Sequence, residues 1–167
     1  VGLVLFAGEE ATQYGTWNSG AAWSTIKVPL SIAALRADQS AAEPLVERAI
    51  SLSDNAAADQ LWGMLGNPAE AATSVDAVLR EGHDAATVVE FQQLQAPYSA
   101  YGQTYWNGTD LATFAFELPC VAGSSAVLEH MRNLGGNQQW GLAPFERVAD
   151  KGGWGPGPDG QYLVRQL

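Results

Sequence analysis

Strand-like patterns occur only near the two ends of this chain, and helical patterns fill the middle. The apolar run Val1–Ala7 and the segment Gln13–Trp17 predict one hairpin. Alternating residues in Arg147–Trp154 and Tyr162–Leu167 predict a second pair of strands. A sheet built from both ends predicts a single α+β domain over residues 1–167. Its sheet part comprises residues 1–20 and 147–167, and its helical part residues 21–146.

Helix signals are clearest at Asn67, a capping residue that is followed by Pro68 and Glu70 at the first and third helical positions. Thr109 is expected to cap a later helix, which Pro119 ends. Residues 83–108 have weak periodicity and many turn formers, so they predict a long surface segment. The expected helices cover residues 24–36, 44–50, 56–65, 68–81, 109–117 and 124–134.

Composition excludes several classes of function. The net charge of −10 repels nucleic acid and anionic membranes, so no nucleic-acid partner is expected. No apolar stretch approaches the roughly 20 residues of a transmembrane helix, and the start of the chain lacks a signal-peptide pattern. Cys120 is the only cysteine, and His83 and His130 lie at no metal-ligand spacing. We therefore expect neither a metal nor an organic cofactor.

The chain contains only two lysines, and each belongs to a short motif. Lys27 closes a Ser-x-x-Lys motif that begins at Ser24, and Lys151 opens a Lys-Gly-Gly-Trp stretch. Ser53-Asp54-Asn55 lies between them, on the expected turn between two helices. The alternative for the first motif is an ordinary capping serine with a solvated lysine.

These motifs carry the parts of a nucleophilic serine site. A residue three positions after Ser24 lies on the same helix face, so Lys27 can take the serine proton if its amine is neutral. Burial or a second cation would keep it neutral, and Lys151 could be that cation. The backbone N–H groups of Ser24 and Trp154 could stabilise an oxyanion. Glycines at 152 and 153 would let a substrate backbone approach the strand.

In this order the three motifs resemble those of the serine β-lactamase and penicillin-binding protein superfamily, in its class A form. The resemblance implies Ser24 as the acylated nucleophile, Lys27 as its base and Ser53 as a proton relay. It implies that Asn55 orients the substrate amide. Lys151 would attract a substrate carboxylate, with Gly152, Gly153 and Trp154 lining the substrate-binding strand.

The chain departs from this family pattern at two site positions. Gly152 stands where the family usually has a hydroxyl residue that binds the substrate carboxylate. The family glutamate that activates water corresponds nearest to Glu90, which is one residue out of register with Leu94-Gln95. Glu90 is therefore a candidate catalytic residue, with a solvated loop carboxylate as the alternative.

The family fold also leads us to expect a fifth strand between the first strand and Tyr162–Leu167, together with terminal helices. The sequence leaves no residues for that strand or for a closing helix. We expect the chain to be incomplete, or another segment or copy to fill the gap, because central strands need their backbone groups paired.

The expected function is a serine hydrolase or transferase that acts on a β-lactam or on a D-Ala-D-Ala-type cell-wall peptide. The resemblance implies an extracytoplasmic location. One alternative is a weak or inactive module that binds cell-wall peptides, and another is an amidase or esterase on the same scaffold. Trp23 and Trp154 could wall the cleft, whereas the other tryptophans, including Trp140, are expected in core or loop packing.

Overall fold

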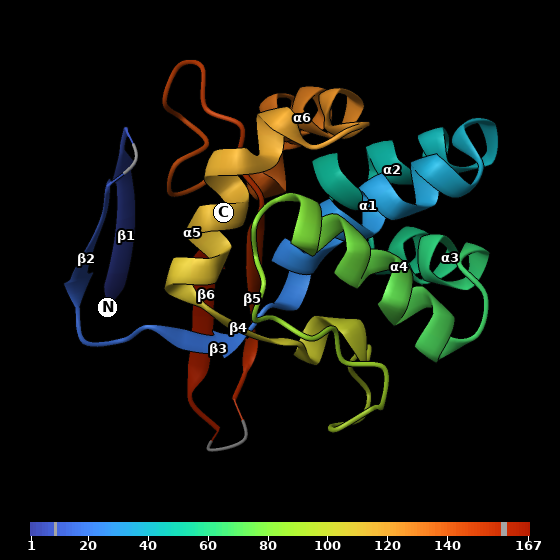
Figure 1. The fold of residues 1–167 in the computed structure, drawn as a ribbon, viewed down its shortest axis with the longest axis horizontal. Coiled ribbons are helices and arrows are strands. Elements are labelled where there is room, and N and C mark those ends of the chain that lie inside the picture. The colour runs from blue at the N-terminus through green and yellow to red at the C-terminus, as the bar shows by residue number, and fades with distance from the viewer. Residues whose placement is uncertain (9, 158–159) are drawn as a thin grey trace.

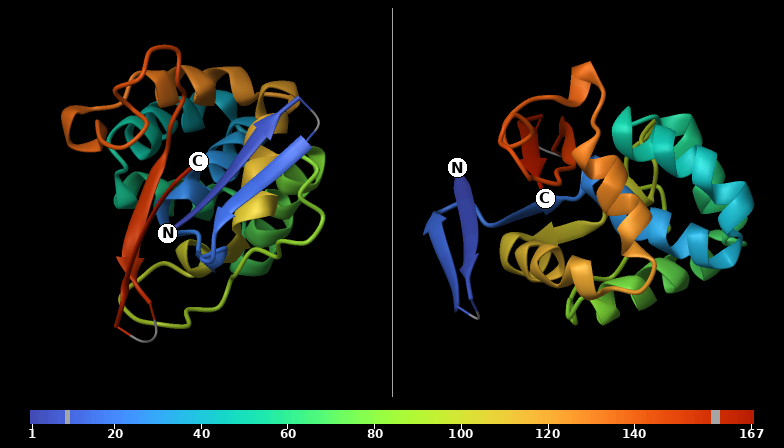
Figure 2. Two further views of the ribbon diagram at one scale, coloured as in Figure 1. Left: turned by 90° about the vertical axis from the view of Figure 1, so that its left-hand side faces the viewer. Right: turned by 90° about the horizontal axis from the view of Figure 1, so that it is seen from above.

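The computed structural model describes residues 1–8, 10–157 and 160–167 (Figures 1 and 2). The strands are β1 (Gly2–Ala7), β2 (Glu10–Gly15), β3 (Ser19–Ala21), β4 (Tyr105–Asn107), β5 (Gly152–Pro156) and β6 (Tyr162–Gln166). The α-helices are α1 (Lys27–Ala37), α2 (Gln39–Ser51), α3 (Asn55–Met64), α4 (Pro68–Glu81), α5 (Gly108–Glu117) and α6 (Ser124–Arg132). Short 3₁₀ turns are η1 (Trp23–Ile26), η2 (Tyr101–Gln103), η3 (Leu118–Cys120) and η4 (Gly136–Gln138).

Helix α1 is the buried centre of the helical part. The stretch from Lys27 to Leu35 is buried, and α1 contacts α2, α3, α4 and α6 (Figure 1). A helix that is apolar on all sides has no solvent face, so its neighbours must surround it. Lys27 is the first residue of this helix and is thereby carried into the interior.

Local capping chemistry sets the helix starts. The predicted start of α4 is confirmed, because Asn67 accepts the N–H groups of Ala69 and Glu70 while the Glu70 carboxylate accepts the Asn67 N–H. The prediction for α2 was too short: Asp38 caps the helix by accepting the Ala41 N–H at 3.1 Å, and Pro44 lies inside it. Proline removes one backbone donor, which the second turn of this helix tolerates.

Three other predictions about element boundaries were wrong. Asn107, not Thr109, caps α5, because its side chain accepts the Asp110 N–H at 2.8 Å. Residues 147–151 are not part of a strand, and β5 begins at Gly152. Ser24 lies in η1, one turn before the α-helix in which it was expected.

The strands form three separate antiparallel pairs in the described residues. The pairs are β1 with β2, β3 with β4, and β5 with β6. Both chain ends thus form hairpins, although β2 spans Glu10–Gly15 rather than the expected Gln13–Trp17. No ladder joins β1 to β6 within the described part of the chain. The β1–β2 hairpin stands at one side and packs on α5, where the rings of Phe6 and Phe116 stack at 4.9 Å (Figure 2).

Two expected turns include residues outside the described ranges. The first is the turn Gly8–Glu10, which includes Glu9, and the second is the turn 155–160, which includes Pro158 and Asp159.

Among the described residues, no single helix is long and apolar enough to cross a membrane. Two helical segments, Gly108–Cys120 and Ser124–Arg132, reach the length and apolar composition of a membrane span only when they are taken together, and the chain bends by 110° between them.

Strand β5 approaches η1 closely because it carries glycine where a side chain would collide. A Cβ atom on Gly153 would lie 2.9 Å from both the Ala22 carbonyl oxygen and the Ser24 nitrogen, and 3.0 Å from the Thr25 nitrogen. Those atoms belong to the backbone and have no freedom to rotate away. Glycine at 153 therefore sets how near the strand lies to the turn that carries Ser24.

We predict that Gly153→Ala separates β5 from η1 and lowers the free energy of unfolding by about 1–3 kcal/mol, as overpacking does in other interiors. Gly63→Ala is the matched control, because Gly63 lies in α3 with nothing within 4 Å of the added Cβ. There alanine should be neutral or stabilise by up to about 1 kcal/mol. Urea unfolding of both variants measures the difference, and equal stabilities would contradict the close approach.

Candidate active site

Ser24 is held in a tight turn directly before α1. The Ala22 N–H donates to the Thr104 carbonyl at 2.7 Å, and the Thr25 hydroxyl donates to the Ala22 carbonyl at 2.6 Å. Trp23, next to Ser24, has a φ of 49°, a left-handed conformation that is rare for a bulky residue. Backbone strain of this kind costs about 1–3 kcal/mol and persists only where the surroundings enforce it.

Packing of the Trp23 ring supplies that enforcement. The ring covers Gly155 so closely that a Cβ there would lie 2.5 Å from the Trp23 Cε2 atom. On another side the ring meets the edge of Tyr98, with 5.1 Å between centroids. Trp23 is therefore wedged between β5 and the 83–108 segment, and it orients Ser24 by its own backbone.

The Lys27 ammonium points toward the Ser53-Asp54-Asn55 turn. Its Nζ donates to the Ser53 carbonyl and to Asn55 Oδ1, both at 2.7 Å, and to the Ser53 hydroxyl at 3.4 Å. None of these three bonds goes to Ser24. In this conformation Lys27 contacts the proposed relay rather than the proposed nucleophile.

Lys151 also reaches the Ser53 hydroxyl. Its Nζ donates to Ser53 Oγ at 2.9 Å and to the Gly152 carbonyl at 2.9 Å, and its side chain is fully buried. The structure thus brings together Lys27, Ser53 and Lys151 from three distant segments. One hydroxyl oxygen accepts from both ammonium groups.

Burial lowers the pKa of both lysines, because an ammonium loses its hydration in the interior. The pKa of Lys27 falls to about 8, with Asp54 and Asp59 acting in the opposite direction. The pKa of Lys151 falls to about 7, through burial and then through the positive charge of Lys27, while Asp150 opposes the shift. One of the two amines is therefore ready to lose a proton near neutral pH.

Asp54 stabilises the Ser53-Asp54-Asn55 turn through two contacts. Asp54 caps α3 by accepting the Ala57 N–H at 3.1 Å and pairs with Arg48. The Ala57 N–H and then Arg48 lower the pKa of Asp54. Ser53 itself has a φ of 56°, a second strained residue at the site. Asp54 thus holds the turn that presents Ser53 and Asn55 to Lys27.

Strand β5 pairs only with β6 in the described residues, so its other edge is open. Lys151 and Leu167 exchange both backbone hydrogen bonds, at 3.0 and 3.1 Å. In an antiparallel pair such residues alternate with residues whose N–H and C=O groups point away from the partner strand. By this alternation Gly152 and Trp154 point their backbone groups to the open edge. The Trp154 N–H therefore points away from β6, to the open edge of the strand whose Gly153 packs against the Ser24 backbone.

Glu90 is separate from this cluster in its hydrogen bonding. Its carboxylate oxygen Oε1 accepts the Phe91 and Gln92 N–H groups at 2.9 and 2.7 Å, and its own N–H donates to the Thr104 hydroxyl at 3.0 Å. The carboxylate closes a local turn. Within the described residues, no hydrogen bond joins it to Ser24 or to either lysine.

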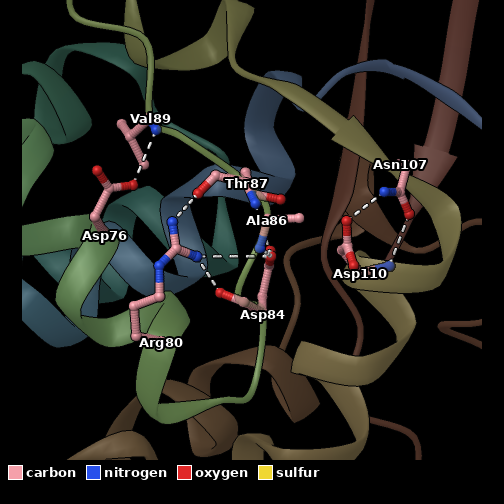
Figure 3. A network of polar contacts seen from close by, with 8 residues as sticks. All are labelled: Asp76, Arg80, Asp84, Ala86, Thr87, Val89, Asn107 and Asp110. Carbon is pink, nitrogen blue, oxygen red and sulfur yellow. Dashed lines mark hydrogen bonds and ion pairs between the residues drawn. The ribbon is translucent and has the colours of Figure 1, made fainter.

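The segment that carries Glu90 is anchored to α4 by a polar network (Figure 3). Arg80 donates to the carbonyls of Asp84 and Thr87, and Asp76 accepts the Val89 N–H at 2.9 Å. Asp84 is fully buried and accepts the Thr87 N–H at 2.9 Å. These contacts hold the first part of the segment to the helix, as far as Val89.

Within the described residues, no group of three or more His, Cys, Asp or Glu side chains is placed to hold a metal ion.

Sequence reasoning missed two residues of the site. Asp150 is fully buried beside Lys151, and burial raises its pKa to about 6. Its Oδ2 accepts from Gln166 Nε2 at 2.8 Å, whereas Oδ1 has no hydrogen-bond partner among the described residues. The sequence did offer a signal for Asp150, because this acidic residue directly precedes Lys151 of the third motif. Trp140, expected in loop packing, instead lies against Gly152.

The fold matches those of solved class A β-lactamases. A class A β-lactamase from Mycobacterium abscessus superposes with a TM-score of 0.66 and 16% identity, covering 95% of this chain and 78% of that chain. A variant of the last common ancestor of Gram-negative bacteria class A β-lactamase gives 0.65 and 18%, covering 95% and 73%. No protein-family model and no curated protein sequence matches the chain significantly. The chain therefore has a serine β-lactamase-like fold, as its motifs predicted.

Asp150 gives a prediction about stability. Because burial raises its pKa in the folded protein from the ordinary value of 3.8 to about 6, ionisation of Asp150 lowers the free energy of unfolding as the pH rises through this range. Asp150→Asn should therefore raise the free energy of unfolding by on the order of 1–2 kcal/mol at pH 7 and leave it unchanged at pH 4. Urea unfolding at the two pH values measures this.

The control is Asp38→Asn, at an exposed capping position where the Ala41 N–H lowers the pKa of the carboxylate. Its effect should have the opposite sign, with stability lost at pH 7 rather than gained. A destabilised Asp150→Asn at pH 7 would contradict the buried charge.

Proposed function

We propose that this chain is an acyl-serine enzyme of the penicillin-recognising type, acting on a β-lactam or a D-Ala-D-Ala-type cell-wall peptide. The observation that carries the proposal is the pair of buried ammonium groups on the Ser53 hydroxyl, beside the turn of Ser24. The structural neighbours are named as β-lactamases, which supports the substrate class. With such substrates the protein would act outside the cytoplasm.

In the acylation step, Ser24 Oγ forms a bond to the substrate carbonyl carbon and its proton passes to the neutral amine of Lys27. Depressed pKa values near 7 and 8 supply that neutral amine at physiological pH. Lys27 hydrogen-bonds Ser53 and Asn55, so a turn of its side chain toward Ser24 precedes the transfer. The N–H groups of Ser24 and Trp154 would donate hydrogen bonds to the carbonyl oxygen and stabilise the negative charge that develops on it.

Collapse of the tetrahedral intermediate breaks the carbon–nitrogen bond. The leaving nitrogen needs a proton, and Ser53 is placed to pass one from a lysine because its hydroxyl accepts from both. That oxygen can give its own proton to the nitrogen and regain one from Lys151 or Lys27. Asn55 keeps Lys27 in reach through the 2.7 Å bond to Oδ1.

Release of the acyl group requires a base that activates water. Glu90 is the only Asp or Glu between residues 85 and 109, and its carboxylate is engaged by two backbone N–H groups. To serve as that base, Glu90 would have to leave its local turn. The acyl-enzyme is therefore proposed to be long-lived, which favours a penicillin-binding, weakly hydrolytic protein as the second candidate. An amidase or esterase would use the same residues with a different substrate.

We predict that the folded protein gains the mass of one penicillin molecule on Ser24 when it is incubated with a penicillin. Ser24→Ala should gain none, because the nucleophile is removed while the lysine pair stays. Intact-protein mass spectrometry with peptide mapping measures the adduct. If wild-type protein with native circular dichroism formed no adduct at millimolar penicillin, the proposed substrate class would be wrong.

The lifetime of the adduct reports on Glu90. We expect the adduct to persist and Glu90→Gln to change its rate of release by less than about twofold, because the carboxylate is held by its own turn. A tenfold slower release in Glu90→Gln would instead assign Glu90 as the water-activating base.

A further inference from the structure

Two indole rings lie over the substrate-binding strand on the face opposite to η1. Trp140 and Trp154 meet edge to face, with 5.8 Å between ring centroids and 72° between ring planes. Side chains alternate along a strand, so Gly152 and Trp154 share one face of β5, while Gly153 faces η1. The indole pair therefore borders the same two residues whose backbone groups point to the open edge.

The Trp140 ring occupies the place of a side chain at position 152. A Cβ atom on Gly152 would lie 2.3 Å from Trp140 Cζ2 and 3.0 Å from Cη2. Any larger residue at 152, including one with a hydroxyl group, would have to displace this ring. Glycine at 152 therefore leaves the space that the Trp140 ring fills. An aromatic surface lies where the family resemblance leads us to expect a hydroxyl group that binds the substrate carboxylate.

Hydrogen bonds from β6 hold Trp140 in this position. Gln166, directly opposite Gly152 in the ladder, donates from Nε2 to the Trp140 carbonyl at 2.9 Å and to Asp150 Oδ2 at 2.8 Å. Its Oε1 accepts the Leu142 N–H at 3.1 Å. The Gln166 side chain therefore ties the backbone of the Trp140 segment to the β5–β6 hairpin, next to the ring that lies against Gly152.

The surface next to Trp140 and Trp154 carries little charge and is partly open to solvent. Trp154 is 39% exposed, whereas the Lys151 side chain is fully buried and donates to Ser53 and Gly152. Burial also lowers the pKa of Lys151 to about 7, so its positive charge is partial at neutral pH. An apolar planar group finds a matching surface here, whereas a carboxylate finds one buried cation and no hydroxyl from residue 152.

We propose that Trp140 and Trp154 form a subsite for a planar aromatic group of the substrate, next to the scissile carbonyl at the Gly152 end of β5. Offset or edge-to-face contact with two indoles favours a flat ring over a puckered ring of the same size. This inference deepens the proposed acyl-transfer function, because it names the group that such a substrate carries beside the reacting bond.

The test compares phenylacetamide with cyclohexylacetamide, two neutral amides with the same number of heavy atoms that differ in the planarity of the ring. Dissociation constants are measured by ligand-detected NMR on Ser24→Ala protein, so no covalent step enters. We expect phenylacetamide to bind at least threefold more tightly, the factor that one aromatic contact of roughly 0.7 kcal/mol gives. Adding Trp140→Leu or Trp154→Leu should bring the ratio to between one and 1.5.

Trp62→Leu in the same Ser24→Ala protein is the matched control. Trp62 lies in α3, outside the proposed subsite, and its ring centroid is 5.0 Å from that of Tyr101 in η2. This variant should keep the threefold preference. Trp154→Leu tests the proposal even if Trp140→Leu does not fold, since Trp154 is partly exposed. Equal binding of the two amides, or a preference that survives both subsite variants, would overturn the subsite.

The two proposals fail separately. Penicillin adduct formation on Ser24 with no ring preference would leave acyl transfer standing and remove the subsite. A ring preference that depends on Trp140 and Trp154, with no adduct, would keep the subsite and remove the substrate class.

Discussion

The structure depends on one electrostatic arrangement, in which two ammonium groups meet at the Ser53 hydroxyl in the interior. An ammonium loses most of its hydration on burial, and two like charges at such short range raise the cost further. The two ammonium groups donate to neutral acceptors rather than to a carboxylate. These acceptors are the carbonyls of Ser53 and Gly152 and the amide oxygen of Asn55. Neutral acceptors satisfy the donors, while Asp54, Asp59 and Asp150 offset the effect of burial on the two pKa values only in part. The result is a pair of lysines whose proton affinity is lowered.

Other costly features of the molecule gather around this pair. Trp23 and Ser53 take left-handed backbone conformations, and Asp150 leaves one carboxylate oxygen without a partner among the described residues. Glycines at 153 and 155 give up side chains so that η1 and the Trp23 ring can reach β5. The packed helix α1, apolar on all sides, stabilises the position of Lys27 against these local costs. Strain and buried charge concentrated at one place are typical of a site selected for chemistry rather than stability.

The sequence was informative where local chemistry decides the structure. The capping box at Asn67 predicted α4, because residue type and spacing carry that information. The cluster of Lys27, Ser53 and Lys151 joins distant segments, and its expectation rested on the family resemblance of the three motifs. The sequence was uninformative where distant packing decides. Trp140 lies on Gly152 through a hydrogen bond from Gln166, and no local pattern relates those three positions. The start of α2 was missed because a proline inside the helix resembled its beginning. Whether Glu90 acts on water also depends on a turn that only the structure displays.

The chain has only two lysines, so their ionisation can be measured directly. Protein labelled with [¹³Cε]lysine should give two side-chain NMR signals, which Lys151→Arg assigns. We predict that both lysines titrate with a pKa well below the ordinary value of 10.5, near 8 for Lys27 and near 7 for Lys151, and that the two titrations are coupled. A signal of either lysine that remains fully protonated up to about pH 10 would contradict the shared buried site, since burial and a second ammonium group both lower a lysine pKa.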